Sequence, residues 1–400
     1  MKNNMDILMI VHTMGNLKIS DNDRFTYIAK KLLDDGNKVE IVTSNFEHHK
    51  KSYRDKKISQ EHPFKITFLH ENAYQKNVSV KRILGHLSFS KRLKKYLKNR
   101  KKPDIIYCAI PPTSSSYTAA KYCKKNNIRF VIDVQDLWPE TFSIALGHSK
   151  FVKILLSPIA NMVNQAYKQA DEIIAVSNTY VNRALKNNRK LKYGHSVFLG
   201  TDGTMVDEFL STDTVEKPNN EFWVGYIGNL GQSYDFLHVF QALEILKKQG
   251  FDNIKFMIVG DGDRRNELAS LSKTYFSNTE ITGYLPYNKM FEYLKKFDIA
   301  LNPIVAGAAN SVVNKVGDYA AAGIPVVNTQ DNEEYRQLLC DYNAGVNTIP
   351  ENAEDIADKI RHLYLEPQTR LKMGNNNRKM FDDKFDRSKT YQEIIDCFQK

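Results

Sequence analysis

The stretch N-S-V-V-N-K-V-G-D-Y-A-A-A-G-I-P-V-V, residues 310–327, is the segment on which our interpretation of this sequence depends. Ser311, Lys315 and Asp318 are spaced i, i+4 and i+7, which places them on one face of a predicted helix. Gly323 is the expected end of that helix, and the apolar residues that follow begin a short strand. The stretch therefore predicts a helix–strand unit of an α/β fold.

The same stretch also suggests a binding site. The turn before the predicted helix, residues 306–310, consists mostly of alanine and glycine, so backbone amides there can approach a ligand closely. Exposed amides, a helix dipole and Lys315 one turn further suit a diphosphate. Asp318 can accept hydrogen bonds from a sugar diol. An amphipathic helix with a surface lysine and a surface aspartate fits these residues equally well.

The composition describes a globular protein. The chain has 400 residues, enough for two domains, and 42% of them are hydrophobic. No apolar run has the length of a membrane span, and the N-terminal apolar run contains Asp6, so we interpret it as a first strand and not as a signal peptide. The four cysteines show no metal spacing. We expect a cytoplasmic chain without a metal ion or other cofactor.

Short apolar runs alternate with helical periodicity along the whole chain. The expected strands are residues 7–11, 39–43, 105–108, 130–134, 173–176, 222–227, 255–259, 298–301 and 325–327, with helices at 24–33, 114–125, 151–170, 236–248 and 290–296. Such a series predicts two doubly wound, Rossmann-like α/β domains that face each other across a cleft. We expect an N-terminal domain over 1–200, a linker over 201–220, a C-terminal domain over 221–385 and a C-terminal helix over 386–400, which can return to the N-terminal domain.

Positive charge is concentrated in residues 80–102, which contain ten Lys and Arg residues in a chain of net charge +11. Two apolar stripes run through this segment with a change of phase near Ser88 and Ser90, so we expect two short amphipathic helices. Basic residues beside an apolar stripe suit an anionic membrane surface, with about 1 kcal/mol per Lys or Arg near the lipid. The alternative is that the stripes belong to the core. Nucleic acid is disfavoured because no recognition motif accompanies the charge.

Four glycine-containing or acidic turns follow expected strands: residues 13–16, 133–140, 228–231 and 260–263. Glycines after strands allow backbone amides to face a phosphate. None of these turns contains G-x-G-x-x-G, and the chain has no P-loop motif, which argues against a nicotinamide dehydrogenase and a P-loop nucleotidase.

Taken in order, these motifs resemble those of the family 4 retaining glycosyltransferases, which have the GT-B fold. The matching segments are D-V-Q-D-L-W-P-E (133–140), F-L-G-T-D-G (198–203), G-Y-I-G-N-L-G (225–231), I-V-G-D-G (258–262) and K-V-G-D-Y-A-A-A-G-I-P-V-V (315–327). The first and last of these look most like the branch that builds capsular, O-antigen and exopolysaccharide repeat units on lipid carriers.

The resemblance implies functional residues. We expect catalytic roles for Asn310, Lys315 and Asp136, and acceptor-side roles for Gln135 and Trp138. Donor contacts are expected from Gly15, Asn229, Gly231, Gly262, Gly283, Tyr284, Ser311, Val312, Val313 and Asp318.

The sequence departs from the family pattern at two places. The family's Glu-x7-Glu pair falls on Asn310 and Asp318, and its phosphate-binding arginine and lysine fall on Asn229 and Tyr234. Lys315 is our expected replacement for this cation pair.

The function implied by the resemblance is transfer of a sugar, with retention and without a metal, from a nucleotide-sugar donor to a polyprenyl-diphosphate-linked saccharide. A UDP-sugar is the favoured donor. The enzyme is expected in the cytoplasm, peripherally associated with the inner face of the membrane through residues 80–102. Two alternatives stay open: a catalytically inactive partner protein with the GT-B fold, and a soluble UDP-sugar epimerase of the same architecture.

Overall fold

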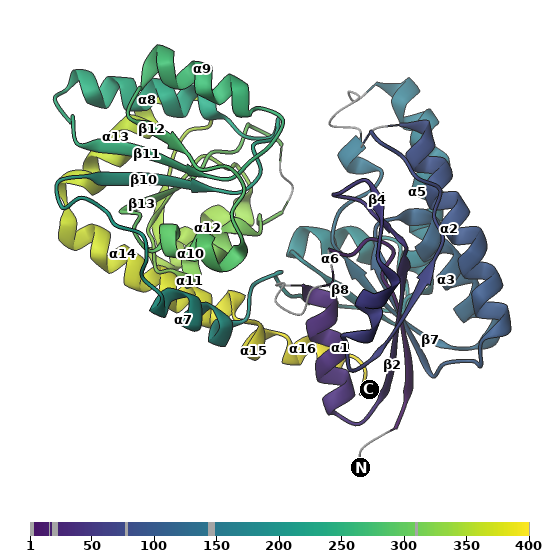
Figure 1. Cartoon of the computed structure of the whole chain (residues 1–400). Helices are drawn as coiled ribbons and strands as arrows, with labels where there is room; N and C mark the ends of the chain where they lie inside the picture. Colours follow the sequence, from purple (N-terminus) through teal and green to yellow (C-terminus); the bar gives the residue numbers. More distant parts are fainter. Residues whose placement is uncertain are drawn as a thin grey trace. The chain divides into compact units, whose positions relative to one another are not determined.

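The computed structural model describes residues 4–15, 17, 23–76, 79–142, 149–308 and 311–399. The chain divides into two units, which we call unit 1 (Met1–Val197 and Tyr391–Lys400) and unit 2 (Phe198–Thr390). Each unit has its own sheet with helices around it (Figure 1).

Unit 1 contains a parallel sheet with seven strands among the described residues, in the order β5-β2-β1-β6-β7-β8-β9. The strands are β1 (Asp6–Ile10), β2 (Lys38–Ser44), β5 (Lys65–Leu69), β6 (Ile105–Ile110), β7 (Arg129–Val134), β8 (Glu172–Ala175) and β9 (His195–Ser196). Every residue of β6 is buried, as expected for a central parallel strand that is covered on both faces. The strand order reverses between β1, which pairs with β2 on one side, and β6 on the other.

The helices of unit 1 complete its two layers. They are α1 (Arg24–Asp34), α2 (Val80–Asn99), α3 (Thr113–Asn126), α5 (Lys150–Gln169), α6 (Asn178–Leu185) and the C-terminal α16 (Gln392–Asp396); a short hairpin, β3 (Phe46–Glu47) and β4 (Ser52–Tyr53), follows β2. Asp23 caps α1, because its carboxylate accepts hydrogen bonds from the amides of Phe25 and Thr26. The C-terminal segment contributes Tyr391, Ile394 and Phe398 to the unit 1 core.

A buried ion pair joins the sheet of unit 1 to its first helix and to the C-terminal segment. Arg24 Nε donates to Asp133 Oδ2 at the end of β7 (2.8 Å), and both side chains are almost completely buried. Arg24 Nη1 donates to the carbonyl of Val197 (3.2 Å) and to the hydroxyl of Tyr391 (2.9 Å). The hydroxyl of Tyr107 also hydrogen-bonds Asp133. These contacts satisfy a charge pair that would otherwise be expensive to bury.

Unit 2 repeats the plan with a second parallel sheet, whose described strands lie in the order β12-β11-β10-β13-β14-β15. The strands are β10 (Phe222–Ile227), β11 (Ile254–Val259), β12 (Thr279–Ile281), β13 (Ile299–Asn302), β14 (Val326–Asn328) and β15 (Gly345–Asn347). The order reverses between β10 and β13, which are neighbours in the sheet. Separate apolar clusters cover the two faces of this sheet.

The helices of unit 2 are α7 (Gly203–Ser211), α8 (Phe236–Lys248), α9 (Arg265–Tyr275), α10 (Tyr287–Leu294), α11 (Lys315–Ala321), α12 (Glu333–Tyr342), α13 (Ala353–Leu365), α14 (Pro367–Met380) and α15 (Arg387–Thr390). Residues 201–220, which we expected to be a linker, contain α7 and belong to unit 2. Val206 of α7 is fully buried in a core cluster of this unit, because the amphipathic helix packs its apolar side inward. Residues 386–390 also belong to unit 2, and the chain enters unit 1 at Tyr391.

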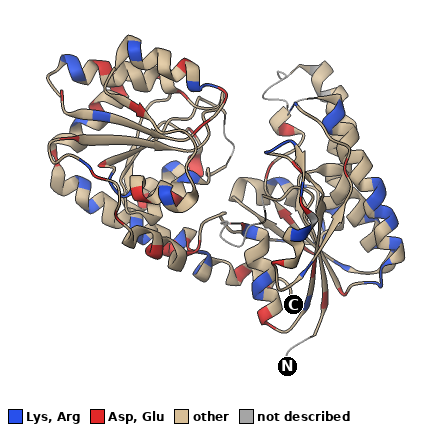
Figure 2. Cartoon of the chain, in the orientation of Figure 1, with Lys and Arg blue, Asp and Glu red and all other residues tan. Residues whose placement is uncertain are grey.

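Residues 80–99 form one continuous helix, α2, so the prediction of two short helices was wrong. The change of phase in the apolar pattern marks the point where the apolar side of α2 passes from solvent into the core. The first apolar stripe is exposed at Val80, Ile83, Leu84 and Leu87, whereas the second is buried in the core at Phe89, Leu93 and Leu97. Lys and Arg residues recur along α2 (Figure 2). Of the helices that the structure describes, none combines the length and the hydrophobicity needed to span a membrane.

We expect Asp133→Asn to destabilise unit 1 by about 3–5 kcal/mol, because it leaves Arg24 buried without a compensating charge. The change can be measured by urea denaturation in a Trp223→Phe background, where Trp138 of unit 1 is the remaining tryptophan. Lys190→Gln is the control, since it removes an exposed ion pair with Asp171 and should cost at most about 1 kcal/mol. Equal losses in both variants would contradict a structural role for the Arg24–Asp133 pair.

Candidate functional site

The candidate donor site lies at the carboxyl ends of β10 and β13, where the strand order of unit 2 reverses. Doubly wound sheets bind ligands at this point, because the loops of the two central strands diverge there. The chain leaves β10 through residues 228–231, and the segment after β13 leads to Lys315 at the start of α11. A Cβ atom at Gly228 would lie only 3.3 Å from Lys315 Nζ. The fold therefore brings together two predicted motifs that are about ninety residues apart in the sequence.

Lys315 is buried and its ammonium group has no polar partner. The residue is 7% exposed, and no hydrogen-bond partner for Nζ exists among the described residues. The nitrogen lies 3.7 Å from the ring centroid of Tyr226 and 3.8 Å from that of Tyr234. Such cation–π contacts replace only part of the lost hydration. Burial lowers the pKa of Lys315 well below its usual value, and the negative charge of Asp318 opposes this shift.

Asp318 lies one turn further along α11 and is held by a hydroxyl group. The hydroxyl of Tyr287 donates to Asp318 Oδ1 (2.6 Å) and lies 3.0 Å from the hydroxyl of Thr201. Burial raises the pKa of Asp318 to about 6, while the hydrogen bond from Tyr287 and the charges of Arg387 and Lys315 act in the opposite direction. The structure thus places the F-L-G-T-D-G motif, through Thr201, beside the acidic residue of the predicted site.

The segment before Lys315 is not the first turn of a helix, contrary to our prediction. The helix α11 begins at Lys315, so Ser311, Val312 and Val313 precede it in an irregular segment. This segment is anchored by the buried Gln330, whose Nε2 donates to the carbonyl of Ser311 (2.7 Å). The predicted catalytic residue Asn310 lies outside the described residues.

Gln330 belongs to a buried amide network that the sequence analysis missed. Asn302, at the end of β13, donates to Asn328 Oδ1 (2.8 Å) and to Gln330 Oε1 (3.1 Å). Asn328 in turn donates to the side chain of Asn347 (2.8 Å). Buried amides must be paired, so this network fixes the ends of three neighbouring strands. Their place in the sequence, each at or just after the end of a strand, was the signal that could have identified them.

The glycine-containing loops after β10 and β11 pack directly against each other. A Cβ at Gly260 would lie 1.8 Å from the carbonyl oxygen of Gly228, and one at Gly262 would lie 2.7 Å from the amide of Leu230. Gly262, which we expected to contact the donor, is therefore required for this close backbone packing. Asn229 is exposed on the neighbouring loop, and Gly231 is partly exposed.

An exposed tyrosine and an arginine lie at the next loop of this edge. Gly283 is buried with a positive φ of 79° and directs the chain into Tyr284, which is 78% exposed. Arg265 at the start of α9 reaches the same turn, since a Cβ at Gly283 would lie 2.9 Å from Arg265 Nη1. Arg265 also faces Asp261 (3.4 Å) and is about half exposed. The sequence analysis did not select Arg265, because no local motif marks it.

The predicted residues of unit 1 lie at the carboxyl ends of β1 and β7. Asp136 accepts hydrogen bonds from Trp138 Nε1 (3.0 Å) and Thr141 Oγ1 (2.8 Å), so its carboxylate holds its own turn together. Gln135 donates to Asp133 (2.5 Å). The carbonyl of Gly15 accepts a hydrogen bond from Arg54 (2.6 Å). These contacts describe a well-ordered edge, and the catalytic and acceptor roles of these residues stay predictions.

The fold also assembles two groups of metal-ligand type that are scattered in the sequence. They are His12, Glu71 and His86, and Glu172, His195 and Cys397; the potential ligand atoms of each group lie within 4.8 Å of one another. His12 Nε2 is 2.9 Å from Glu71 Oε2, and His195 Nδ1 is 2.8 Å from a carboxylate oxygen of Glu393. Glu393 lies outside both groups, and a metal-free reaction stays a prediction.

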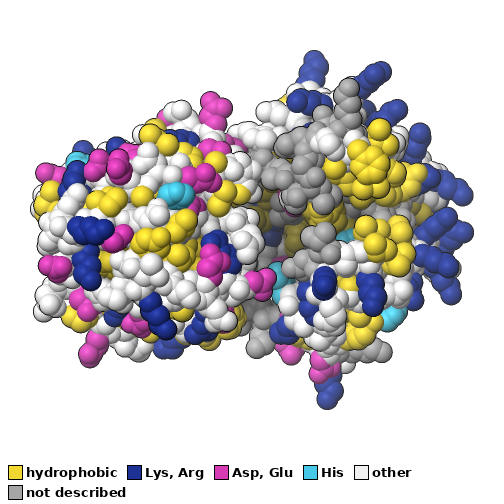
Figure 3. All heavy atoms as spheres, turned by 90° about the horizontal axis from the view of Figure 1, so that it is seen from above, with side chains coloured by type: hydrophobic (Ala, Val, Ile, Leu, Met, Phe, Trp, Pro, Cys, Tyr) yellow, Lys and Arg dark blue, Asp and Glu magenta, His cyan; other side chains and the backbone are white. Residues whose placement is uncertain are grey.

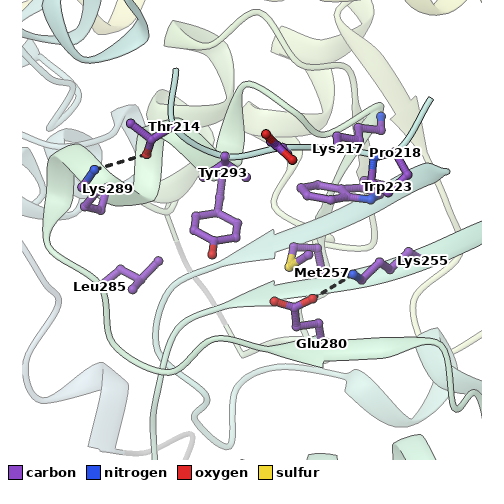
Figure 4. A pocket seen from close by; sticks show the side chains of 12 residues that line it. Thr214, Lys217, Pro218, Trp223, Lys255, Met257, Glu280, Leu285, Lys289 and Tyr293 are labelled. Atoms are coloured by element: carbon purple, nitrogen blue, oxygen red, sulfur yellow. Dashed lines mark hydrogen bonds and ion pairs between the residues drawn. The ribbon is translucent and has the colours of Figure 1, made fainter. Parts of the chain in front are cut away.

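Unit 2 also contains a pocket of about 700 Å³, which lies away from the candidate site. Trp223 and Lys255 line it from the amino-terminal parts of β10 and β11, and Tyr293 lines it from α10 (Figure 4). Its three lysines are paired: Lys255 with Glu280 (2.8 Å), Lys289 with Glu292 (2.8 Å) and Lys217 with Asp298. Because ligands of doubly wound sheets bind at the carboxyl ends of the strands, we do not assign the donor to this pocket.

Two models of known protein families match this chain. The model described as "Glycosyltransferase Family 4" matches residues 24–191, and the model described as "Glycosyl transferases group 1" matches residues 210–380. Among curated proteins, the capsular polysaccharide biosynthesis glycosyltransferase CapM of Staphylococcus aureus is 22% identical over 338 residues, which cover 81% of this chain and 84% of CapM.

Solved structures with the same architecture cover nearly the whole chain. Sucrose-phosphate synthase from Thermosynechococcus elongatus superimposes with a TM-score of 0.71 at 14% identity, over 98% of each chain. Anabaena HepE in complex with UDP-glucose superimposes with a TM-score of 0.68 at 15% identity, over 99% of each chain. The predicted GT-B fold with two Rossmann-like domains is confirmed.

We expect Lys315→Met to stabilise unit 2 by about 1–3 kcal/mol at pH 7, because it removes an unsatisfied buried donor and keeps the contact with the tyrosine rings. The pKa of Lys315 is lower in the folded than in the unfolded chain, so between these two pKa values the unfolded chain binds more protons than the folded one. Wild-type stability should therefore rise with pH toward about 10.4, and the gain from the substitution should shrink there.

Urea denaturation at pH 7 and pH 9.5 measures this effect in a Trp138→Phe background, in which Trp223 of unit 2 is the remaining tryptophan. Lys248→Met, at an exposed position of the same unit, is the control and should change stability by less than about 0.5 kcal/mol. A less stable Lys315→Met variant at pH 7 would show that the ammonium group is well accommodated.

Proposed function

This chain belongs to the family 4 glycosyltransferases of the GT-B fold, and from this premise we propose that it transfers a sugar from a UDP-linked donor to a lipid-linked saccharide. Unit 2 binds the donor in this proposal, and unit 1 binds the acceptor. The single observation that carries the proposal is the buried ammonium group of Lys315 beside Gly228, at the strand-order reversal of unit 2, without a hydrogen-bond partner among the described residues.

The chemistry of Lys315 supports an anionic ligand at this point. A buried cation without a polar partner destabilises a fold, so a diphosphate that supplies the missing charge gains affinity there. The family's own phosphate-binding lysine falls on Tyr234, and the ring of Tyr234 touches the ammonium group of Lys315. The ammonium group of Lys315, which comes from α11, thus lies where other family members place a phosphate-binding lysine from the loop after β10. Donor binding exchanges the ring contacts for a charge–charge contact.

The remaining residues of this edge supply the other donor contacts. Tyr284 is exposed and offers a flat surface on which the uracil base can stack, with Arg265 beside it. Asp318 has one oxygen bound to Tyr287 and uses the other for the ribose hydroxyls. Ser311, Val312 and Val313 present backbone groups on a segment anchored by Gln330. HepE was solved with UDP-glucose, which favours UDP as the nucleotide here.

The proposed reaction retains the anomeric configuration and needs no protein nucleophile. The acceptor hydroxyl attacks the anomeric carbon from the side of the leaving group, the bond from this carbon to the diphosphate breaks, and the diphosphate takes the proton of the hydroxyl. Lys315 stabilises the negative charge that develops on the leaving diphosphate. One well-placed donor of this kind typically contributes about 2.7–4 kcal/mol to lowering the barrier.

The relationship to CapM and the surface of unit 1 support a lipid-linked acceptor and a place at the membrane. CapM acts in capsular polysaccharide biosynthesis, and repeat units of such polymers grow on prenyl-linked carriers in the branch that this sequence resembles. The first half of α2 exposes Ile83 and Leu84 beside basic residues, and α5 exposes Ile154. Apolar side chains with neighbouring Lys and Arg favour an anionic membrane surface. We propose peripheral membrane attachment through this face.

We expect Lys315→Ala to lower turnover by about 10²–10³-fold, because it removes the group that stabilises the leaving diphosphate. The assay measures UDP release from a panel of UDP-sugars in the presence of membrane lipid extract, after a thermal-shift screen selects the donor. Lys248→Ala is the control and should keep wild-type turnover. Near-normal turnover in Lys315→Ala would remove this residue from its role. Donor binding with neither UDP release nor conversion of any UDP-sugar would favour the inactive partner protein. Conversion of a UDP-sugar to its epimer without net release of UDP would favour the epimerase.

We expect the double variant Leu84→Asp, Ile154→Asp to lose at least tenfold in affinity for vesicles that contain phosphatidylglycerol, since it replaces two exposed apolar side chains by charges of the lipid's own sign. Flotation of vesicles measures the bound fraction. Leu371→Asp, at an exposed apolar position of unit 2, is the control. Unchanged flotation of the double variant would exclude this face as the membrane contact.

A further inference from the structure

Unit 1 contains an apolar pocket of about 500 Å³ that no part of the proposed donor site uses. The pocket lies between α2, the start of α3 and the first half of α5, and its aliphatic wall includes Leu87, Leu156, Ile159 and Met162. Sites for small molecules have this size and this predominantly apolar lining.

The pocket opens into the exposed apolar face of unit 1. Ile83, Leu87 and Leu155 line the pocket and are also 46–61% exposed. Further apolar side chains of the same two helices, Leu84 and Ile154, lie on the surface and do not line the pocket. Hydrophobic side chains gather on this face of unit 1 next to a row of Lys and Arg (Figure 3). A hydrocarbon chain in a membrane therefore meets a continuous apolar path from the surface into the pocket.

Polar and cationic groups line one wall of the pocket. The guanidinium carbon of Arg82 lies 5.1 Å from the ring centroid of Trp138, and His86 stacks on the same ring at 5.8 Å. Arg82 also lies 6.0 Å from the ring of Tyr74, over which Lys51 is placed at 5.1 Å. Burial lowers the pKa of Lys51, and the charge of Arg82 acts in the same direction. The guanidinium group of Arg82 would attract an anionic group at this wall.

We propose that this pocket binds the proximal prenyl chain of the acceptor lipid, with the lipid phosphate at Arg82. The inference rests on the proposed function and assigns the acceptor lipid its binding place. A volume of about 500 Å³ is that of a site for one small ligand, which suits a single hydrocarbon chain. Charge complementarity orients this chain, because its phosphate end meets the cationic wall and its hydrocarbon end meets the aliphatic one.

Trp138 makes the pocket directly observable. Trp138 lines the pocket, and the second tryptophan, Trp223, belongs to unit 2. In a Trp223→Phe background, farnesyl diphosphate below its micelle concentration should change the emission of Trp138 in a saturable way. Inorganic diphosphate at the same concentration should leave the emission unchanged, because the hydrocarbon chain is the part that enters. Equal responses to both probes would overturn the proposal in favour of a simple phosphate site.

Two Ile→Phe substitutions on α5 distinguish binding inside the pocket from binding to the exposed surface around it. Ile159→Phe adds bulk inside the pocket, and Ile154→Phe adds it on the exposed face of α5, where the residue is 71% exposed. We expect Ile159→Phe to weaken binding of farnesyl diphosphate at least tenfold and to leave vesicle flotation unchanged. Ile154→Phe should bind farnesyl diphosphate as the parent does. Undiminished binding in Ile159→Phe, or equal loss in both variants, would overturn the proposal.

A third variant tests the phosphate end and does not depend on the packing of the pocket. Arg82→Gln should lower the affinity for farnesyl diphosphate about tenfold and leave the affinity for farnesol unchanged. Equal losses for both ligands would contradict the placement of the phosphate. These measurements need neither donor nor turnover, so they separate the two proposals. Binding of farnesyl diphosphate without any sugar transfer would count against the transferase function alone, and transfer without binding would count against the pocket alone.

Discussion

The burial of one ammonium group that has no hydrogen-bond partner among the described residues organises the candidate site of this protein. Lys315 lies at the strand-order reversal of unit 2, covered by two tyrosine rings and by Gly228. A fold selected for stability alone would place an apolar residue there, because an unpartnered ammonium group in the interior is unfavourable. Proteins accept such unfavourable arrangements mainly at functional sites, where a ligand completes them. The neighbouring Asp318, with a pKa raised to about 6, belongs to the same arrangement.

In unit 1, by contrast, the buried charges of Arg24 and Asp133 are paired. Arg24 and Asp133 are as deeply buried as Lys315, yet each has its charge partner and further hydrogen bonds. Such a fully paired network stabilises a fold and leaves no capacity for a ligand. Comparing the two units therefore separates a structural charge from a functional one by the single criterion of whether its polar atoms are satisfied. Proximity to the end of a strand does not make this distinction, since Asp133 lies near the end of β7 and the lysine segment follows β13.

The two halves of helix α2 have different surroundings. Its second half buries Phe89 and Leu93 against the sheet, while its first half leaves Ile83 and Leu84 exposed. The same periodic pattern of apolar residues therefore describes a core face in one half and a free surface in the other. A pattern of hydrophobicity states which residues share a face of the helix. What covers that face is decided by the neighbouring elements, here by where the sheet of unit 1 ends.

The alternation of apolar runs and helical periodicity in the sequence was sufficient to predict the two α/β units and most of their central strands, because strand and helix periods are local properties. The motif around Lys315 was equally visible, because its members lie within one stretch of chain. Only the tertiary structure decided that this lysine is buried between Tyr226 and Tyr234, that α11 begins at Lys315, and that Gln330 holds the preceding segment. These features depend on contacts between residues that are far apart in the chain, and solvent exclusion, which sets the charge state of a side chain, arises only when such segments pack together.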